Sequence, residues 1–188
     1  MANTDRERQR DIPVTTEKKI EELHELIDGI EVAMMTTRRA DGSLVSRPMQ
    51  TQDRDDQADL WYVTDIETHK LDELAHDPHV NLAFYQPKTK EWVSVSGVVR
   101  VSQDRALIRR LYDRSWKVWF PDDGPGRDGG PDDPRIAVLC VDTDSVTYMT
   151  VDKPKPAVLY EIAKGYVTGK EPDVGRTERL SEGELGTR

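Results

Sequence analysis

Residues 32–51 read VAMMTTRRADGSLVSRPMQT, which is the pattern of two strands around a turn. The first run, Val32–Thr37, has the period of a strand. The turn Ala40–Ser43 contains an Asp-Gly pair, a strong local signal for a hairpin. The returning run, Leu44–Thr51, is interrupted by Pro48, and a proline favours a sheet edge or a bulge. The sequence therefore predicts an antiparallel hairpin whose second strand lies at an edge.

The strand period recurs along the rest of the chain. Further strands are expected at Leu60–Thr64, Val80–Tyr85, Glu91–Ser102, Ile136–Val141 and Ser145–Val151, and helices at Glu17–Asp28, His69–His76, Asp104–Ser115 and Ala157–Val167. Strands that do not alternate regularly with helices argue against a doubly wound parallel sheet, and short strands with few helices favour a barrel. The expected class is mainly β with flanking helices (α+β).

Composition bounds the organisation of the chain. Its 188 residues suit one domain, expected over 13–168, with a disordered N-terminus over 1–12 and a polar tail over 169–188. Pro121–Arg135 holds four Pro, four Gly and five Asp, so we expect a long loop there.

Charge, hydropathy and cysteine content limit the kinds of partner and the cellular compartment that are expected. A net charge of −9 without a basic cluster argues against nucleic-acid binding. No stretch approaches the ~20 apolar residues of a membrane span, so no membrane partner is expected. The single cysteine, Cys140, lies in an apolar run and is interpreted as a buried core thiol, since one cysteine forms no disulfide within the chain. A cytoplasmic protein is expected.

Three segments together predict a phosphate site. Arg47 on the hairpin and Lys70 in the first turn of a helix supply positive charge. The start of that helix offers free backbone N–H groups, and the hydroxyls of Thr64 and Thr68 are available to the remaining oxygens. A flat ring then fits along the Trp61–Thr64 strand. From the residues alone, solvated charges and packed aromatic side chains remain the alternative interpretation.

A set of ordered stretches carries a resemblance to a known family. They are MMTTRRADGSLVSRPM (34–49), LWYVTDIETHKLDEL (60–74), DPHVNLAFYQP (77–87), WVSVSGVVRVSQD (92–104) and KVWFPDDG (117–124). In this order they resemble the pyridoxamine phosphate oxidase-like flavin-binding split barrels, most closely the general stress protein branch. The resemblance runs from about Ile20 to Tyr148. It implies a six-stranded antiparallel split β-barrel of the FMN-binding type and a homodimer with flavin sites at its interface.

The resemblance also implies roles for individual residues. Arg47 and Lys70 bind the FMN phosphate, and Trp119 approaches the flavin from the other subunit. Tyr62, Val63 and Thr64 line the isoalloxazine ring. The full implied cofactor-binding set is Arg47, Pro48, Met49, Tyr62, Val63, Thr64, Thr68, His69, Lys70, Trp116 and Trp119. The sequence departs from the family in the long Pro121–Arg135 loop and in Tyr148–Thr150, where relatives often carry Tyr-Trp-Asp.

Alternation along one strand supports a dimer independently. Val93, Val95, Val99 and Val101 fall on one face, as a barrel core needs. The opposite face, with Trp92, Ser94, Ser96 and Val98, is too apolar for a simple solvent face. We therefore expect that face to meet a partner, with Trp92 and Ser94 as interface candidates and a two-fold dimer as the commonest arrangement.

The expected function is an FMN-dependent oxidoreductase with a role in the stress response and a small-molecule redox partner. Its substrate and catalytic residues stay unidentified, and FAD is the alternative cofactor because the long loop can shape room for a larger one. A non-catalytic protein that stores or senses flavin is the second hypothesis. A haem or deazaflavin ligand and a dimer without ligand are further alternatives. His76 and His79 flank a helix stop and are interpreted as a surface pair, so no metal site is expected.

Overall fold

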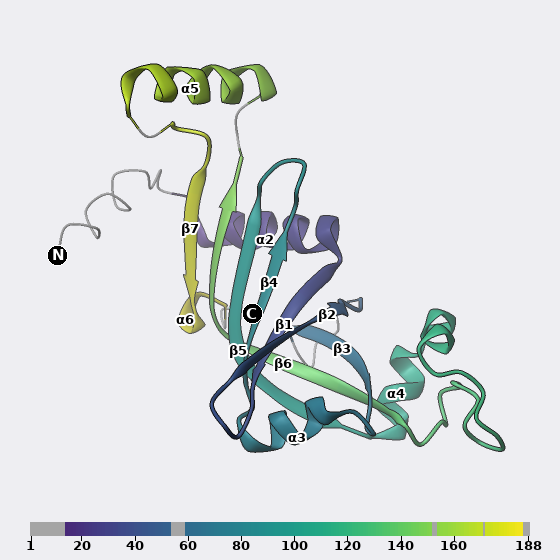
Figure 1. Cartoon of the computed structure of the whole chain (residues 1–188). Helices are drawn as coiled ribbons and strands as arrows, with labels where there is room; N and C mark the ends of the chain where they lie inside the picture. The colour runs from purple at the N-terminus through teal and green to yellow at the C-terminus, as the bar shows by residue number, and fades with distance from the viewer. Residues whose placement is uncertain (1–13, 54–58, 152–153, 171, 186–188) are drawn as a thin grey trace. The chain divides into compact units, whose positions relative to one another are not determined.

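The computed structural model describes residues 14–53, 59–151, 154–170 and 172–185, so the predicted N-terminal segment 1–12 lies outside the described residues. The helices are α2 (Thr16–Ile30), α3 (His69–His76), α4 (Arg105–Leu111), the 3-10 helix η1 (Arg114–Val118), α5 (Lys155–Thr168) and α6 (Glu182–Leu185). The strands are β1 (Val32–Arg38), β2 (Leu44–Gln50), β3 (Leu60–Asp65), β4 (His79–Tyr85), β5 (Trp92–Ser102), β6 (Ile136–Thr150) and β7 (Arg176–Ser181) (Figure 1).

Seven strands form the sheet in the order β2-β1-β4-β5-β6-β3, and β7 pairs with β6. The predicted class, mainly β with flanking helices, is confirmed. Two strand expectations are corrected: Ile136–Val141 and Ser145–Val151, expected as two strands, form the single strand β6, and the unexpected β7 raises the count above the six that the resemblance implies. This strand corrects the expected polar tail at 169–188: Arg176, Glu178 and Leu180 are buried while the residues between them are exposed. Charged residues at two of the inward positions conceal the strand from a search for apolar alternation.

The chain forms two compact units, each assembled from segments that are distant in sequence. Of the described residues, the site unit comprises those within Glu31–Ala83 and Val95–Asp144, and the terminal unit comprises those within 14–30, Phe84–Ser94 and 145–185. The boundaries fall within or beside strands. No linker-like composition marks them, which is why the sequence predicts one domain over 13–168.

The site unit begins with the predicted hairpin. β1 and β2 are antiparallel, with Met35 opposite Arg47 and Met34 opposite Pro48. Gly42 has φ +85°, the left-handed conformation that glycine adopts without strain. β2 ends the strand order, so Pro48 lies on an edge strand as expected.

The core of the site unit is formed by alternate residues of β1, β4 and β5 and by consecutive buried residues of β3 and β6. Met35, Tyr62, Leu82, Val95 and Leu139 are almost completely buried. Cys140 is buried in β6, as expected of a core thiol. Of the valines expected to face the core, Val99 is buried, whereas Val101, near the end of β5, is 44% exposed.

The Pro121–Arg135 segment is irregular, as predicted, and it is held by buried charges. Asp133 and Arg135 are both buried and pair at 2.7 Å. Arg135 also donates to the backbone oxygens of Pro121 (3.0 Å) and Arg127 (2.9 Å), and Tyr112 donates to Gly129 O (3.1 Å). Hydrogen bonds to its own backbone therefore fix the conformation of this loop.

In the terminal unit, a charged cluster joins α2 to β6 and β7. Lys19 pairs with Glu178 at 2.9 Å, and Arg176 pairs with Glu22. The hydroxyl of Tyr148 lies 3.1 Å from Glu22 Oε2, and burial, followed by the charge of this carboxylate, raises the Tyr148 pKa. Tyr148 belongs to the segment that departs from the family, and it provides packing for α2.

Candidate functional site

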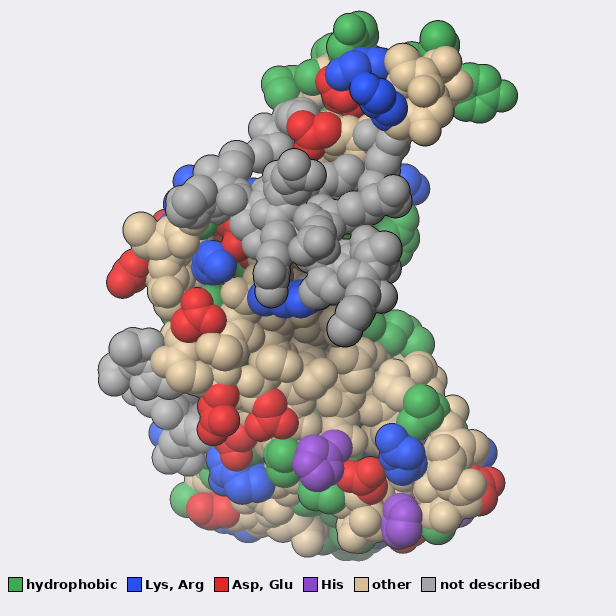
Figure 2. Space-filling model, turned by 90° about the vertical axis from the view of Figure 1, so that its left-hand side faces the viewer, with side chains coloured by type: hydrophobic (Ala, Val, Ile, Leu, Met, Phe, Trp, Pro, Cys, Tyr) green, Lys and Arg blue, Asp and Glu red, His purple; other side chains and the backbone are tan. Residues whose placement is uncertain are grey.

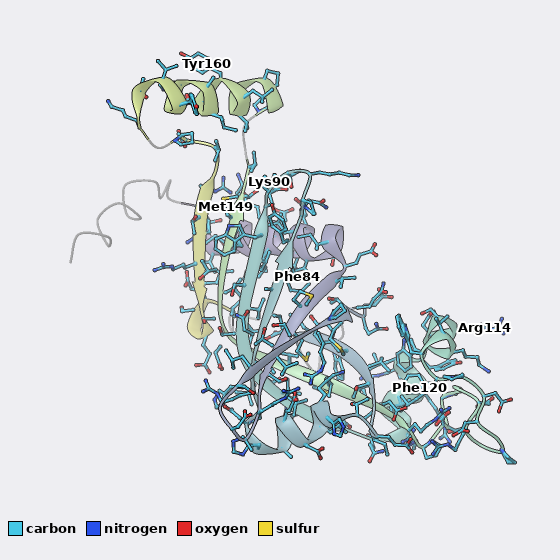
Figure 3. The ribbon with its side chains drawn as sticks, viewed as in Figure 1. Phe84, Lys90, Arg114, Phe120, Met149 and Tyr160 are labelled. Carbon is cyan, nitrogen blue, oxygen red and sulfur yellow. The ribbon has the colours of Figure 1, made fainter. Side chains whose placement is uncertain are left out.

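A cleft of about 730 Å³ opens in the site unit. Its lining comes from the edge strand β2 and the residues after it, the end of β3, the start of α3, and the end of α4 with the segment that follows. The lining residues are Pro48–Asp53, Val63–Asp65, Thr68, Lys70, Arg110–Asp113, Ser115, Trp116, Trp119 and Phe120. Arg114 and Phe120, labelled in Figure 3, mark the segment after α4.

Lys70 places a buried cation in the wall of this cleft. Its side chain comes from the first turn of α3, and the residue is 7% exposed. The ammonium donates to Thr64 Oγ1 (3.0 Å) and contacts Met49 Sδ (3.2 Å), both neutral. Among the described residues, no carboxylate lies within ion-pair distance of it. Burial, and then the nearby positive charge of Arg47, lower the Lys70 pKa to about 8. A bound anion would relieve this unfavourable burial.

Arg47 lies beside Lys70 in a second group of charges. Its Nη1 and Nη2 donate to the two oxygens of Glu73 at 2.7 and 2.8 Å, and Nη1 also donates to Thr37 Oγ1 at 2.9 Å. Arg39 Nε donates to the same carboxylate at 3.2 Å. Glu73 is buried, and the hydrogen bonds from Arg47 are the main reason why its pKa falls to about 2. Two arginines thus share a single carboxylate, and with the nearby Lys70 this leaves an excess of positive charge.

The start of α3 adds backbone donors. The Thr68 hydroxyl donates to Asp65 O at 2.8 Å and does not cap the helix. No hydrogen bond found among the described residues uses the amide hydrogens of His69 or Lys70. Such groups attract anions, because they carry the positive end of the helix dipole.

The opposite wall of the cleft is aromatic. Trp116 is buried, and its Nε1 donates to Gln52 Oε1 at 2.8 Å. Its ring meets Tyr112 edge-on, with centroids 5.5 Å apart. Trp119 lines the cleft and is 73% exposed. A flat apolar ligand would gain contact area here.

The described residues show no group of three or more His, Cys, Asp or Glu side chains able to hold a metal ion. Within the described ranges, no helix has the length and apolar character needed to cross a membrane.

Comparison with known proteins identifies the family of this chain. Residues 18–173 match the family described as pyridoxamine 5'-phosphate oxidase like. The chain belongs to this family. A relative, Protein bli-3 of Neurospora crassa, is 35% identical over 178 residues, which cover 93% of this chain and 85% of the relative.

Two solved structures have the same fold as this chain. A putative general stress protein 26 from Jannaschia sp. CCS1 is 24% identical, with a TM-score of 0.61, and the match covers 86% of this chain and 99% of that one. A pyridoxamine 5'-phosphate oxidase-related, FMN binding protein from Nostoc punctiforme PCC 73102 is 15% identical, with a TM-score of 0.58, and the match covers 90% and 98%.

The structure brings together most residues that the family resemblance implies for the cofactor. Those that line the cleft are Pro48, Met49, Val63, Thr64, Thr68, Lys70, Trp116 and Trp119. Arg47 stands outside the lining set, joined to Glu73. Tyr62 is completely buried behind the cleft, where its hydroxyl accepts from Thr51 Oγ1 at 3.3 Å. The His69 side chain is 97% exposed and faces Asp72 at 3.6 Å, away from the lining residues.

Several residues of this site were not predicted from the family pattern. Glu73 follows Lys70 by three positions on α3, and this helical spacing is the signal that places both on one face. Gln52 and Tyr112 join the cleft through tertiary packing. No sequence signal points to them.

Proposed function

We propose that this member of the pyridoxamine 5'-phosphate oxidase like family binds FMN in the cleft and acts as an oxidoreductase. The observation that carries the proposal is the buried Lys70 ammonium, which lines the cleft with only neutral hydrogen-bond partners among the described residues. A buried cation without a counter-charge is destabilising, and an anionic ligand bound beside it would supply that counter-charge. The FMN-binding name of the Nostoc relative supports flavin as that ligand.

The charges favour FMN over FAD. A phosphate monoester carries roughly −1.5 to −2 charges near neutral pH. Arg39, Arg47 and Lys70 together exceed Glu73 by two charges, which matches such a group. FAD carries its two negative charges on two phosphates, one on each, so it presents less charge at a single group than the phosphate monoester of FMN. We propose Arg47, Lys70, Thr64, Thr68 and the amides at the start of α3 as the phosphate site.

The remaining lining residues suit the flavin ring. Val63 on one side and Trp116 and Trp119 on the other provide apolar surface, and the Gln52 side chain, bonded to Trp116, adds polar atoms at the wall. Bound flavin supplies hydride or electron-pair transfer, while the chain orients the ring and excludes water from it. The stress-protein name of the Jannaschia relative supports a role in the stress response.

Titration of the purified protein with FMN, FAD and riboflavin tests this proposal. We expect FMN to bind at one per chain and riboflavin to bind much more weakly, measured by quenching of flavin fluorescence. Reduction of bound FMN by NADH or NADPH, followed by reoxidation, would support turnover. FMN binding without turnover with any donor would instead favour the flavin-storage or sensing function. Absence of binding by all three flavins would refute the proposal.

The proposed active form is a homodimer, supported by an exposed apolar surface on α5. This α5 surface consists of Leu159, Tyr160, Ile162, Tyr166 and Val167, which are 49–94% exposed. Green side chains gather around α5 at the top of Figure 2, and Figure 3 labels Tyr160 on this helix. The five side chains are uncharged, and Lys164, whose Nζ lies 6.0 Å from the centroid of the Tyr160 ring, borders them. The net charge of −9 disfavours an anionic membrane as its partner.

A further inference from the structure

We propose that Glu73 is a positioning residue, which holds the Arg47 guanidinium so that one of its edges is presented to the bound anion. This inference rests on the proposed function, in which the anion is the phosphate of FMN. It adds a residue with the same charge as the ligand to the phosphate site. The family resemblance does not indicate such a residue.

The hydrogen bonds divide the guanidinium into an occupied edge and an available one. A guanidinium group has five N–H donors in a rigid plane. Arg47 uses its Nη1 and Nη2 edge on the Glu73 carboxylate, at 2.7 and 2.8 Å, and its remaining Nη1 hydrogen on Thr37. Nε–H and the second Nη2 hydrogen have no partner among the described residues. These two point in the same direction, so they form a second fork for a bidentate phosphate contact.

Glu73 is itself fixed firmly enough to orient another residue. Its carboxylate accepts from Thr37 Oγ1 (2.6 Å) and Arg39 Nε (3.2 Å) in addition to Arg47, and the residue is 6% exposed. With its pKa near 2, the carboxylate stays charged at every pH at which the protein is expected to work. A buried, fully bonded carboxylate has a single orientation, and it passes this orientation to the longer arginine side chain.

One helix carries both parts of the arrangement. Lys70 and Glu73 lie three positions apart on the buried face of α3, together with Leu74. Lys70 contributes a cation directly to the cleft, and Glu73 fixes a second cation that comes from β2. The packing of α3 therefore sets the position of Arg47 relative to Lys70.

A carboxylate near an anion also repels it. The direction in which FMN affinity changes when Glu73 is neutralised therefore distinguishes a positioning role from charge balance. If Glu73 only balances charge, its neutralisation strengthens anion binding, because the excess positive charge grows. If Glu73 positions Arg47, its neutralisation weakens binding, because the long arginine side chain is released to other orientations. The two roles predict opposite changes in FMN affinity.

The test compares Glu73→Gln with the wild type, with FMN and riboflavin as ligands. Glutamine keeps the size of the side chain and some of its hydrogen bonds but loses the charge-assisted pair. We expect FMN affinity to fall about tenfold and riboflavin affinity to stay within about twofold, since charged hydrogen bonds are the strong ones. Glu91→Gln is the matched control: this half-buried carboxylate accepts two hydrogen bonds and does not line the cleft.

A double-mutant cycle with Arg47→Ala separates positioning from a structural role. If Glu73 acts through Arg47, Glu73→Gln has no further effect on the FMN-to-riboflavin ratio once Arg47 is absent. Equal losses for both ligands, tighter FMN binding in Glu73→Gln, or additive losses in the cycle would overturn the inference. Because the wild type is measured alongside, a protein that fails to prefer FMN over riboflavin would instead refute the proposed phosphate site.

Discussion

At the scale of single residues, the buried charge of Lys70 governs both the proposed site and a measurable pH dependence. Its pKa in the folded protein is about 8, below the usual 10.5, because burial disfavours the ammonium. Between these two values the unfolded chain binds more protons than the folded one. The free energy of unfolding of the cofactor-free protein therefore rises as the pH increases from 8 to 10.5.

Lys70→Met isolates this effect. The variant removes the buried charge, so we expect a higher free energy of unfolding at pH 7 and a smaller rise between pH 8 and 10.5 than in the wild type. Urea denaturation of the cofactor-free proteins at several pH values measures both. Identical pH profiles for the two proteins would contradict the buried ammonium. Saturation with FMN, if it binds at Lys70, should flatten the wild-type profile because the phosphate stabilises the charged form.

The two tryptophans of the cleft differ in burial, and mutation can measure the effect of this difference on stability. Trp116 is buried and bonded to Gln52, so Trp116→Phe should lower the free energy of unfolding by about 1–3 kcal/mol. Trp119 is 73% exposed, so Trp119→Ala should change it by less than about 0.5 kcal/mol. In FMN titrations, Trp119→Ala should nevertheless weaken binding. Unchanged flavin affinity would remove Trp119 from the proposed site.

Residue chemistry explains which parts of the site were predictable. Lys70 and Thr64 were predicted because a lysine at a helix start and a threonine on the preceding strand suit an anion. The exposure of His69 was not predicted. Adjacent positions on a helix face different directions, and the sequence does not reveal whether His69 or Lys70 turns inward. Glu73 was overlooked because a lone glutamate on a short helix usually faces solvent.

At the scale of elements, the Pro121–Arg135 loop shows how buried charges replace regular structure. Asp133 is 1% exposed, and it accepts from the Arg135 guanidinium and from Gly129 N (2.8 Å). Its neighbour Asp132 pairs with Arg109 at the surface, where its side chain is 66% exposed. These adjacent aspartates provide an internal comparison of a buried and an exposed ion pair.

We expect Asp133→Ala to lower the free energy of unfolding by about 3–5 kcal/mol, because Arg135 is left as an unpaired buried charge. Asp132→Ala, its matched control, should lower it by less than about 1 kcal/mol. Denaturant unfolding of both variants measures the difference. Equal values would mean that the loop does not depend on the Asp133–Arg135 pair.

Element boundaries followed the sequence where local signals were strong. The helix predicted at His69–His76 has these bounds, and Asp77-Pro78 ends it as expected. The helix predicted over Asp104–Ser115 divides into α4 and η1: Asp104 caps α4 as expected, and Asp113 accepts from Ser115 N and starts a new turn. Asp113 lies in the cleft wall, so this break, invisible in apolar periodicity, helps to shape the site.

At the scale of the whole molecule, the proposed homodimer depends on the exposed apolar surface of α5. The interface residues expected from the sequence, Trp92 and Ser94, are both half-buried within the chain. The α5 surface offers larger side chains, with Tyr166 at 94% exposure. Stable interfaces bury roughly 800 Å² per partner, and aromatic side chains supply much of their energy. This surface is therefore the stronger candidate in the chain for contact with a second copy.

Sedimentation of a variant with Tyr160→Lys and Tyr166→Lys tests the dimer. In the wild type we expect a dimer at micromolar concentration. In the variant, four lysines would meet across a two-fold axis, and burying them without partners opposes association, so a monomer is expected. Thr168→Lys, at an exposed polar position of the same helix, adds charge outside the apolar surface and should stay dimeric. A variant that remains a dimer would exclude α5 from the interface. A wild type that sediments as a monomer would refute the dimer itself, while a site formed within one chain would still bind FMN.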